Sequence, residues 1–195
     1  MKDYLFGYGS LIGQKSRDEE GITFDPVPIR LFGYRREWNV KVDNHNGMGI
    51  MGLGVIKSRK SYCNGILFGC EDIEDFKRRE FKFDYSIEKF DRRDILFLNK
   101  KLNLENDNLW YFTPNHHHLP TKKTPIRQSY LDVCMMSCLE INEDFAKDFV
   151  KTTHDWLFWI NDRKNPCYKN PGIEIDTKKI DRILKEVMKD RFNRI

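Results

Sequence analysis

The chain has 195 residues, of which 39% are hydrophobic and 33% charged, and it includes 14 Phe, 8 Tyr and 4 Trp. This length suits one domain, or one domain with an added helix, and the aromatic content can build a packed core, which excludes a disordered chain. The net charge of +4 comes from 34 basic and 30 acidic residues that are interspersed, so we expect no nucleic-acid partner.

The five cysteines are odd in number and form no Cys-x-x-Cys pair, which predicts reduced thiols rather than a disulfide framework. Residues 1–4 lead directly into the first predicted strand and leave no room for a secretory signal, and no apolar run is long enough to span a bilayer. We therefore expect a soluble cytoplasmic protein with no membrane partner, present as a monomer or a weak homodimer.

The first predicted element is a short strand, Tyr4–Phe6, that runs into the loop Gly7-Tyr8-Gly9-Ser10-Leu11. The two glycines let such a loop turn backbone N–H groups inward with no Cβ in the way, which suits an anionic or carbonyl oxygen. An ordinary hairpin turn is the alternative interpretation of the same residues.

Short strands dominate the rest of the first two thirds of the chain. We predict them at 27–32, 37–42, 54–57, 65–68, 95–98 and 109–113, and Asn64-Gly65 is typical of a hairpin turn between the third and fourth of these. Strands so closely spaced favour an α+β fold with a small closed or nearly closed β-barrel and surrounding helices.

Helices are predicted at 72–80, 129–140, 142–160 and 177–192, with a loop at 164–172. Asn142 fits the N-cap of the third helix, because acidic residues follow it in the first turn. The last helix, within residues 176–195, is amphipathic, and we expect it to dock on the domain formed by residues 1–175 through the stripe Ile180, Ile183, Leu184, Val187 and Met188.

Four segments together indicate a chemistry. They are Phe6-Gly7-Tyr8-Gly9-Ser10-Leu11; Leu31-Phe32-Gly33-Tyr34-Arg35-Arg36; Asn64-Gly65-Ile66-Leu67-Phe68 with a helix ending in Arg78-Arg79-Glu80 and then Tyr85; and Ser129-Tyr130-Leu131-Asp132. Their order and spacing resemble the γ-glutamylcyclotransferase family, including its ChaC-type branch that degrades glutathione. The resemblance covers about residues 4 to 160.

The resemblance implies a cofactor-free reaction on a small γ-glutamyl substrate, which is a peptide, glutathione or an amine. The α-amine attacks its own γ-carbonyl and gives 5-oxoproline and a released amine. By the same resemblance, Glu80 is the catalytic general acid and base, the loop Tyr8-Gly9-Ser10-Leu11 binds the substrate, and Tyr130 lies at the mouth of the site. No metal is implied.

Other interpretations of these residues stay open. Without the resemblance, Glu80 fits a solvated helix-end residue paired with Arg78 or Arg79. Glu71, Glu74 and Glu88 are rival acids, and either Arg35 or Arg36 could clamp a carboxylate, although strand alternation lets at most one of them face a pocket. The whole chain could also be a related γ-glutamyl amide lyase or a non-catalytic member of the fold that binds a small ligand or partner.

The chain departs from the family where the helix that carries Glu80 reads Phe76-Lys77-Arg78-Arg79-Glu80 instead of Leu-Asp-x-x-Glu, and where a polar segment at 13–20 replaces an aromatic one. Both departures put the substrate in doubt.

Residues 47–52 match G-x-G-x-x-G, but no helix is predicted after them to hold a pyrophosphate. His116-His117-His118 lies in a predicted solvated loop without an acidic partner at ligand spacing.

Overall fold

The computed structural model describes residues 1–42 and 49–192. Its main sheet has seven strands in the order β4-β6-β1-β3-β2-β5, with β8 paired to β2, and β7 and β9 form a small second sheet. The strands are β1 (Asp3–Gly7), β2 (Thr23–Val42), β3 (Ile50–Cys70), β4 (Tyr85–Lys89), β5 (Ile95–Phe97), β6 (Asn108–Pro114), β7 (Ile126–Arg127), β8 (Thr153–His154) and β9 (Trp159–Ile160). The helices are α1 (Gln14–Asp18), α2 (Ile73–Glu80), α3 (Gln128–Ile141), α4 (Glu143–Lys151) and α5 (Thr177–Phe192), with 3-10 turns η1 (Ser10–Ile12), η2 (Phe81–Phe83) and η3 (Arg92–Asp94).

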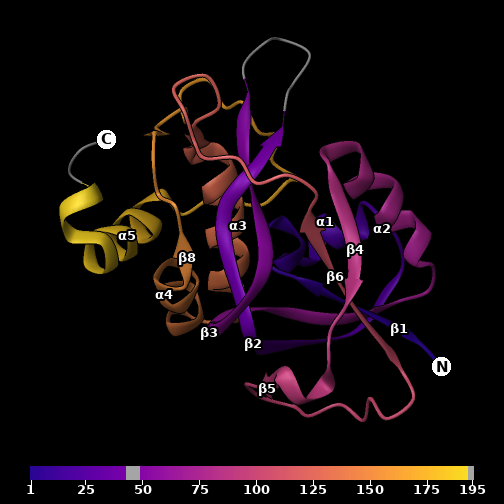
Figure 1. Ribbon diagram of the computed structural model, residues 1–195. Helices are drawn as coiled ribbons and strands as arrows, with labels where there is room; N and C mark the ends of the chain where they lie inside the picture. The colour runs from indigo at the N-terminus through magenta and orange to yellow at the C-terminus, as the bar shows by residue number, and fades with distance from the viewer. Residues whose placement is uncertain (43–48, 193–195) are drawn as a thin grey trace.

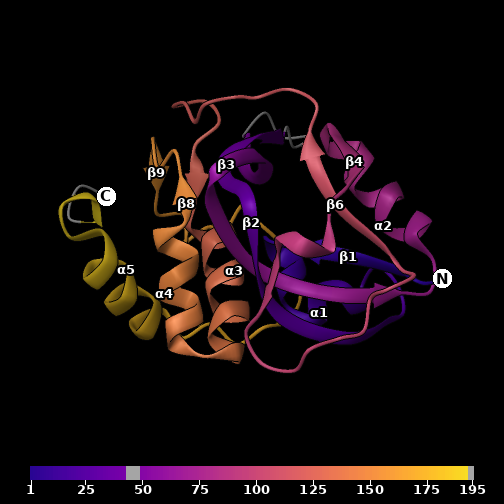
Figure 2. The same ribbon diagram turned by 60° about the horizontal axis from the view of Figure 1, so that its bottom comes forward.

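The predicted mixed α+β class is confirmed, whereas the barrel is not. The strands of the main sheet follow an open path from β4 to β5. Figures 1 and 2 show the long β2–β3 pair through the middle of the molecule, with α3, α4 and α5 on one side and α2 on the other. A continuous apolar core joins the strands to α3, α4 and α5.

The predicted hairpin turn at Asn64-Gly65 is wrong, because both residues lie inside β3, opposite Arg30 and Ile29 of β2. Packing explains these two residues. The Asn64 amide donates to the carbonyl of Phe145 at 2.8 Å. A Cβ on Gly65 would lie 2.5 Å from the Phe6 ring, so only glycine fits beneath that ring.

The predicted helix at 142–160 begins as expected and ends early, at Lys151. The Asn142 side chain accepts a hydrogen bond from Phe145 N at 2.8 Å, which confirms the N-cap. At the other end, the hydroxyls of Thr152 and Thr153 donate back to the carbonyls of the preceding turn, and the chain then pairs with β2 as β8.

Helix α5 covers α4, as the apolar stripe predicted. Ile180, Ile183 and Leu184 are fully buried, and Glu186 pairs with Lys147 of α4 at 2.8 Å. The domain boundary at 175/176 stays a prediction.

None of the helices in the described residues combines the length and apolar character needed to cross a bilayer. Of the glycine-rich segment 47–52, residues 47 and 48 lie outside the described residues, and 50–52 belong to β3 rather than to a helix.

Candidate active site

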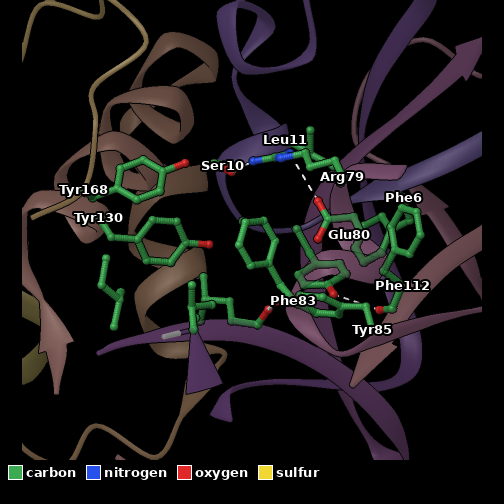
Figure 3. Close-up of a pocket in the computed structure, with 17 residues that line it drawn as sticks. Phe6, Ser10, Leu11, Arg79, Glu80, Phe83, Tyr85, Phe112, Tyr130 and Tyr168 are labelled. Carbon is green, nitrogen blue, oxygen red and sulfur yellow. Dashed lines mark hydrogen bonds and ion pairs between the residues drawn. The ribbon is translucent and has the colours of Figure 1, made fainter. Parts of the chain in front are cut away.

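All six residues selected from the sequence line one cavity of about 100 Å³ (Figure 3): Tyr8, Gly9, Ser10, Leu11, Glu80 and Tyr130. The cavity lies where β1 ends, α2 ends and α3 begins. At about 10–15 Å³ for each water-sized group, it has room for roughly seven to ten such groups, which is the scale of an amino-acid moiety. The catalytic and binding roles of these residues stay predictions.

Glu80 is the last residue of α2, and the packing of that helix aims it at the cavity. Asp72 caps the helix by accepting a hydrogen bond from Glu74 N at 2.9 Å. Phe76 lies one turn before Glu80 on the same face of the helix, is fully buried and packs against Phe68, with ring centroids 5.5 Å apart. The next turn therefore brings Glu80 to the cavity wall, where its side chain is only 12% exposed.

Burial raises the pKa of Glu80 above its ordinary value. Arg79, 3.2 Å away through Nη1, opposes this rise, and the negative charge of Glu20 adds to it. The alternative of a helix-end ion pair is therefore half right: Glu80 does pair with Arg79, but it is not solvated. A carboxyl group with a raised pKa exchanges a proton closer to neutral pH, as a general acid and base requires.

The rival acids lie elsewhere. Glu88 accepts hydrogen bonds from Lys57 at 2.9 Å and Tyr111 at 2.8 Å, which hold its pKa below the ordinary value and keep it ionised. Glu71 and Glu74 are exposed. Among the residues that the structure describes, Glu80 is the only acid that lines the cavity.

The loop after β1 follows the cavity wall with its backbone. The Tyr8 hydroxyl donates to the carbonyl of Phe112 at 2.8 Å, which fixes the loop against β6. A Cβ on Gly9 would lie 2.8 Å from the Tyr130 hydroxyl oxygen, too close for an ordinary contact. Glycine at position 9 therefore lets the backbone and the Tyr130 phenol share the same wall.

Neither arginine of the Tyr34-Arg35-Arg36 segment lines the cavity. Arg36 is fully buried behind it and donates to the carbonyl of Tyr8 at 3.3 Å and to that of Asn64 at 2.6 Å. In a trans peptide the C=O and the next N–H point to opposite sides. Because the Tyr8 carbonyl faces Arg36, the N–H of Gly9 is directed away from Arg36.

Arg79 and Tyr168 are site residues that the sequence analysis missed. Arg79 Nη2 donates to Ser10 Oγ at 3.0 Å, while Nη1 is buried and makes no hydrogen bond to the described residues. Tyr168 lies with its ring 4.7 Å from that of Tyr130. Arg79 could have been identified from its position next to Glu80 in the sequence. Tyr168 comes from an irregular loop, and no signal in the sequence marks it.

The histidine loop also differs from expectation. His117 Nε2 lies 3.4 Å from Glu37 Oε2, and Asp155 approaches both. The sequence analysis considered acidic residues at ligand spacing along the chain, and residues 37 and 155 are far from the loop in sequence but close to it in the fold.

Comparisons with known proteins bear on the fold. No family model and no curated protein match the sequence. A solved structure described as a gamma-glutamyl cyclotransferase is similar to this chain with a TM-score of 0.56 and 11% identity, over 93% of this chain and 98% of that one. An uncharacterized human protein gives a TM-score of 0.52 and 11% identity, over 92% of this chain and 96% of that one. The chain therefore has the γ-glutamylcyclotransferase fold.

Proposed function

We propose that this protein is a γ-glutamylcyclotransferase, an enzyme that converts a γ-glutamyl peptide, glutathione or a γ-glutamyl amine into 5-oxoproline and a free amine. The observation that supports this most is Glu80, a buried acid with a raised pKa that shares a cavity with the Tyr8–Leu11 loop. The fold supports the class of protein, and the site geometry supports the reaction.

Arg79 and Glu80 place a cation next to an anion in the cavity wall. This pair is complementary to the α-carboxylate and α-ammonium groups of an amino acid. We assign the substrate α-carboxylate to Arg79, whose Nη1 has a hydrogen bond to offer, and the α-ammonium to Glu80. An incoming ammonium stabilises the carboxylate form of Glu80, so the bound substrate prepares its own base.

The reaction then needs two proton transfers, because the amine nitrogen loses two protons on the way from ammonium to lactam and the leaving nitrogen gains two. Glu80 takes a proton from the ammonium, and the freed amine nitrogen bonds to the γ-carbonyl carbon. We assign the resulting oxyanion to the N–H of Gly9, a residue that lines the cavity and whose N–H points away from Arg36. The bond to the leaving amine breaks as protonated Glu80 gives its proton to that nitrogen. The Glu80 carboxylate then takes the second proton from the ring nitrogen, which leaves the neutral lactam, and passes it to the released amine, which departs as an ammonium. Holding amine and carbonyl together contributes up to about 7–11 kcal/mol, and the proton transfer roughly 10²–10⁴-fold.

The test is to incubate the purified protein with γ-glutamyl peptides, glutathione and γ-glutamyl amines and to measure 5-oxoproline. We expect product from at least one class, and the class identifies the leaving amine. If no compound gives product while one of them binds, the protein is a non-catalytic member of the fold, and the proposed reaction is wrong.

A further inference from the structure

A second cluster of polar side chains lies outside the cavity. Glu37 of β2, His117 of the β6–β7 segment and Asp155 after β8 bring three donor atoms within 4.8 Å of one another. None of the three lines the candidate active site. Because they come from segments about 40 to 120 positions apart, only the fold assembles them.

The spacing within the cluster fits shared coordination better than a direct hydrogen bond. Glu37 Oε2 and His117 Nε2 lie 3.4 Å apart. A charge-assisted N–H···O hydrogen bond is shorter, about 2.7–2.9 Å. Two ligands at about 2.0–2.1 Å from a tetrahedral metal lie roughly 3.3–3.4 Å from each other, which matches this pair. Asp155 is half-buried, and one of its carboxylate oxygens lies within 4.8 Å of both other donor atoms.

The surroundings of Glu37 leave one of its oxygens for a cation. Its carboxylate is fully buried, and Arg35 pairs with the other oxygen, Oε1. Asn39, also fully buried, donates from Nδ2 to Oε2 at 3.2 Å, and its own Oδ1 has no hydrogen-bond partner among the described residues.

The geometry points to a divalent-metal site of the zinc class formed by Glu37, His117 and Asp155. Two carboxylates supply anionic oxygen ligands, and one imidazole completes a mixed oxygen and nitrogen set that suits zinc. The ion links β2, the histidine loop and the segment after β8, so its role is to hold these three segments together. The site is independent of the proposed cyclisation.

The experiment uses the full chain, stripped with a chelator and titrated with Zn²⁺ by calorimetry, with Co²⁺ absorption as a second probe. We expect one ion per chain and a rise in the thermal midpoint on binding. His117→Ala and Asp155→Asn should each weaken binding by roughly tenfold or more, since loss of an outer partner alone costs about 10–100-fold. His118→Ala is the matched control, because it removes a neighbouring imidazole that is not a proposed ligand.

Both test variants change an exposed or half-buried side chain, so they are expected to fold, and circular dichroism checks this. If only one of them folds, that one carries the test. Zn²⁺ binding as tight in His117→Ala as in His118→Ala would place the ion elsewhere, for example on the free thiols, and would overturn the assignment. The absence of binding to the unmodified chain would overturn it equally.

Discussion

Replacement of Glu80 by Gln tests the proposed base and the electrostatics of the cavity in one variant. The amide keeps the shape of the side chain but cannot carry the proton. We expect 5-oxoproline formation to fall roughly 10²–10⁴-fold. At about 1.4 kcal/mol for each factor of ten, that is roughly 2.7–5.4 kcal/mol of the barrier.

The same variant should stabilise the fold at neutral pH. At 3.2 Å, the attraction to Arg79 is worth about 5 kcal/mol at an effective dielectric constant of 20, whereas burial of a carboxylate costs several kcal/mol. The raised pKa of Glu80 shows that the cost of burial is the larger. The carboxylate of Glu80 is therefore less stable in the folded state than in the unfolded chain, whereas glutamine is neutral at every pH.

The pH dependence has a defined sign. Below the unfolded pKa of glutamate, about 4.3, both states hold the proton and the penalty is absent. As the pH rises from there to the raised folded pKa of Glu80, the unfolded state releases its proton first, so stability falls. Above the folded pKa the penalty is complete, and each unit of the difference corresponds to about 1.4 kcal/mol. The gain from Glu80→Gln should therefore vanish near pH 4 and grow as the pH rises toward the folded pKa of Glu80.

The assay combines 5-oxoproline release with thermal midpoints between pH 4 and 8. Glu74→Gln is the matched control, because Glu74 lies on the same helix, is exposed and pairs with Lys77 at 2.7 Å. It should keep turnover and show no gain in midpoint at high pH. Wild-type turnover in Glu80→Gln would reject Glu80 as the base. A Glu80→Gln midpoint at pH 8 below that of the wild type would refute the argument from burial.

Further predictions concern the groups around Glu80. Arg79→Lys should raise KM for γ-glutamyl substrates about tenfold with a smaller change in kcat, because it loses the guanidinium fork; an unchanged KM in steady-state kinetics would contradict the carboxylate assignment. Gly9→Ala should lower turnover because its Cβ meets the Tyr130 hydroxyl, and Tyr130→Phe in the same chain should restore part of it; equal turnover of the single and double variants would place the fault elsewhere. Arg36→Met should lower the free energy of unfolding, measured in urea, by roughly 3–5 kcal/mol, because several buried acceptors lose their donor. An unchanged urea midpoint would refute the stabilising role of Arg36.

The sequence predicted the elements whose signals are local. Helices α2 and α5 lie within a residue of the expected bounds, because a cap or an apolar stripe encodes each of them. Asn142 marked the start of α4 for the same reason. The six selected site residues share a cavity because they fall at element ends, where loops gather.

Features that depend on partners far along the chain were not predicted from the sequence. β2 and β3 are 20 and 21 residues long, and their length comes from pairing with each other rather than from any local pattern. The sequence predicted Asn64 as a turn residue, because nothing local indicates that its amide donates to the carbonyl of Phe145, which is distant in the chain. Arg36 reads as a ligand for an anion, whereas its acceptors come from four separate segments.

The buried Arg36 explains how a short glycine loop can hold a fixed orientation. A loop with glycine on both sides of Tyr8 has little conformational preference of its own. Arg36 holds the Tyr8 carbonyl from behind, and the same guanidinium is anchored to the carbonyls of Asn64 in β3 and Phe149 in α4. Because peptide geometry couples that carbonyl to the N–H of Gly9, the core sets the direction of the proposed oxyanion donor. A donor fixed before the substrate arrives needs no reorganisation during the reaction, which is what electrostatic stabilisation of an oxyanion requires.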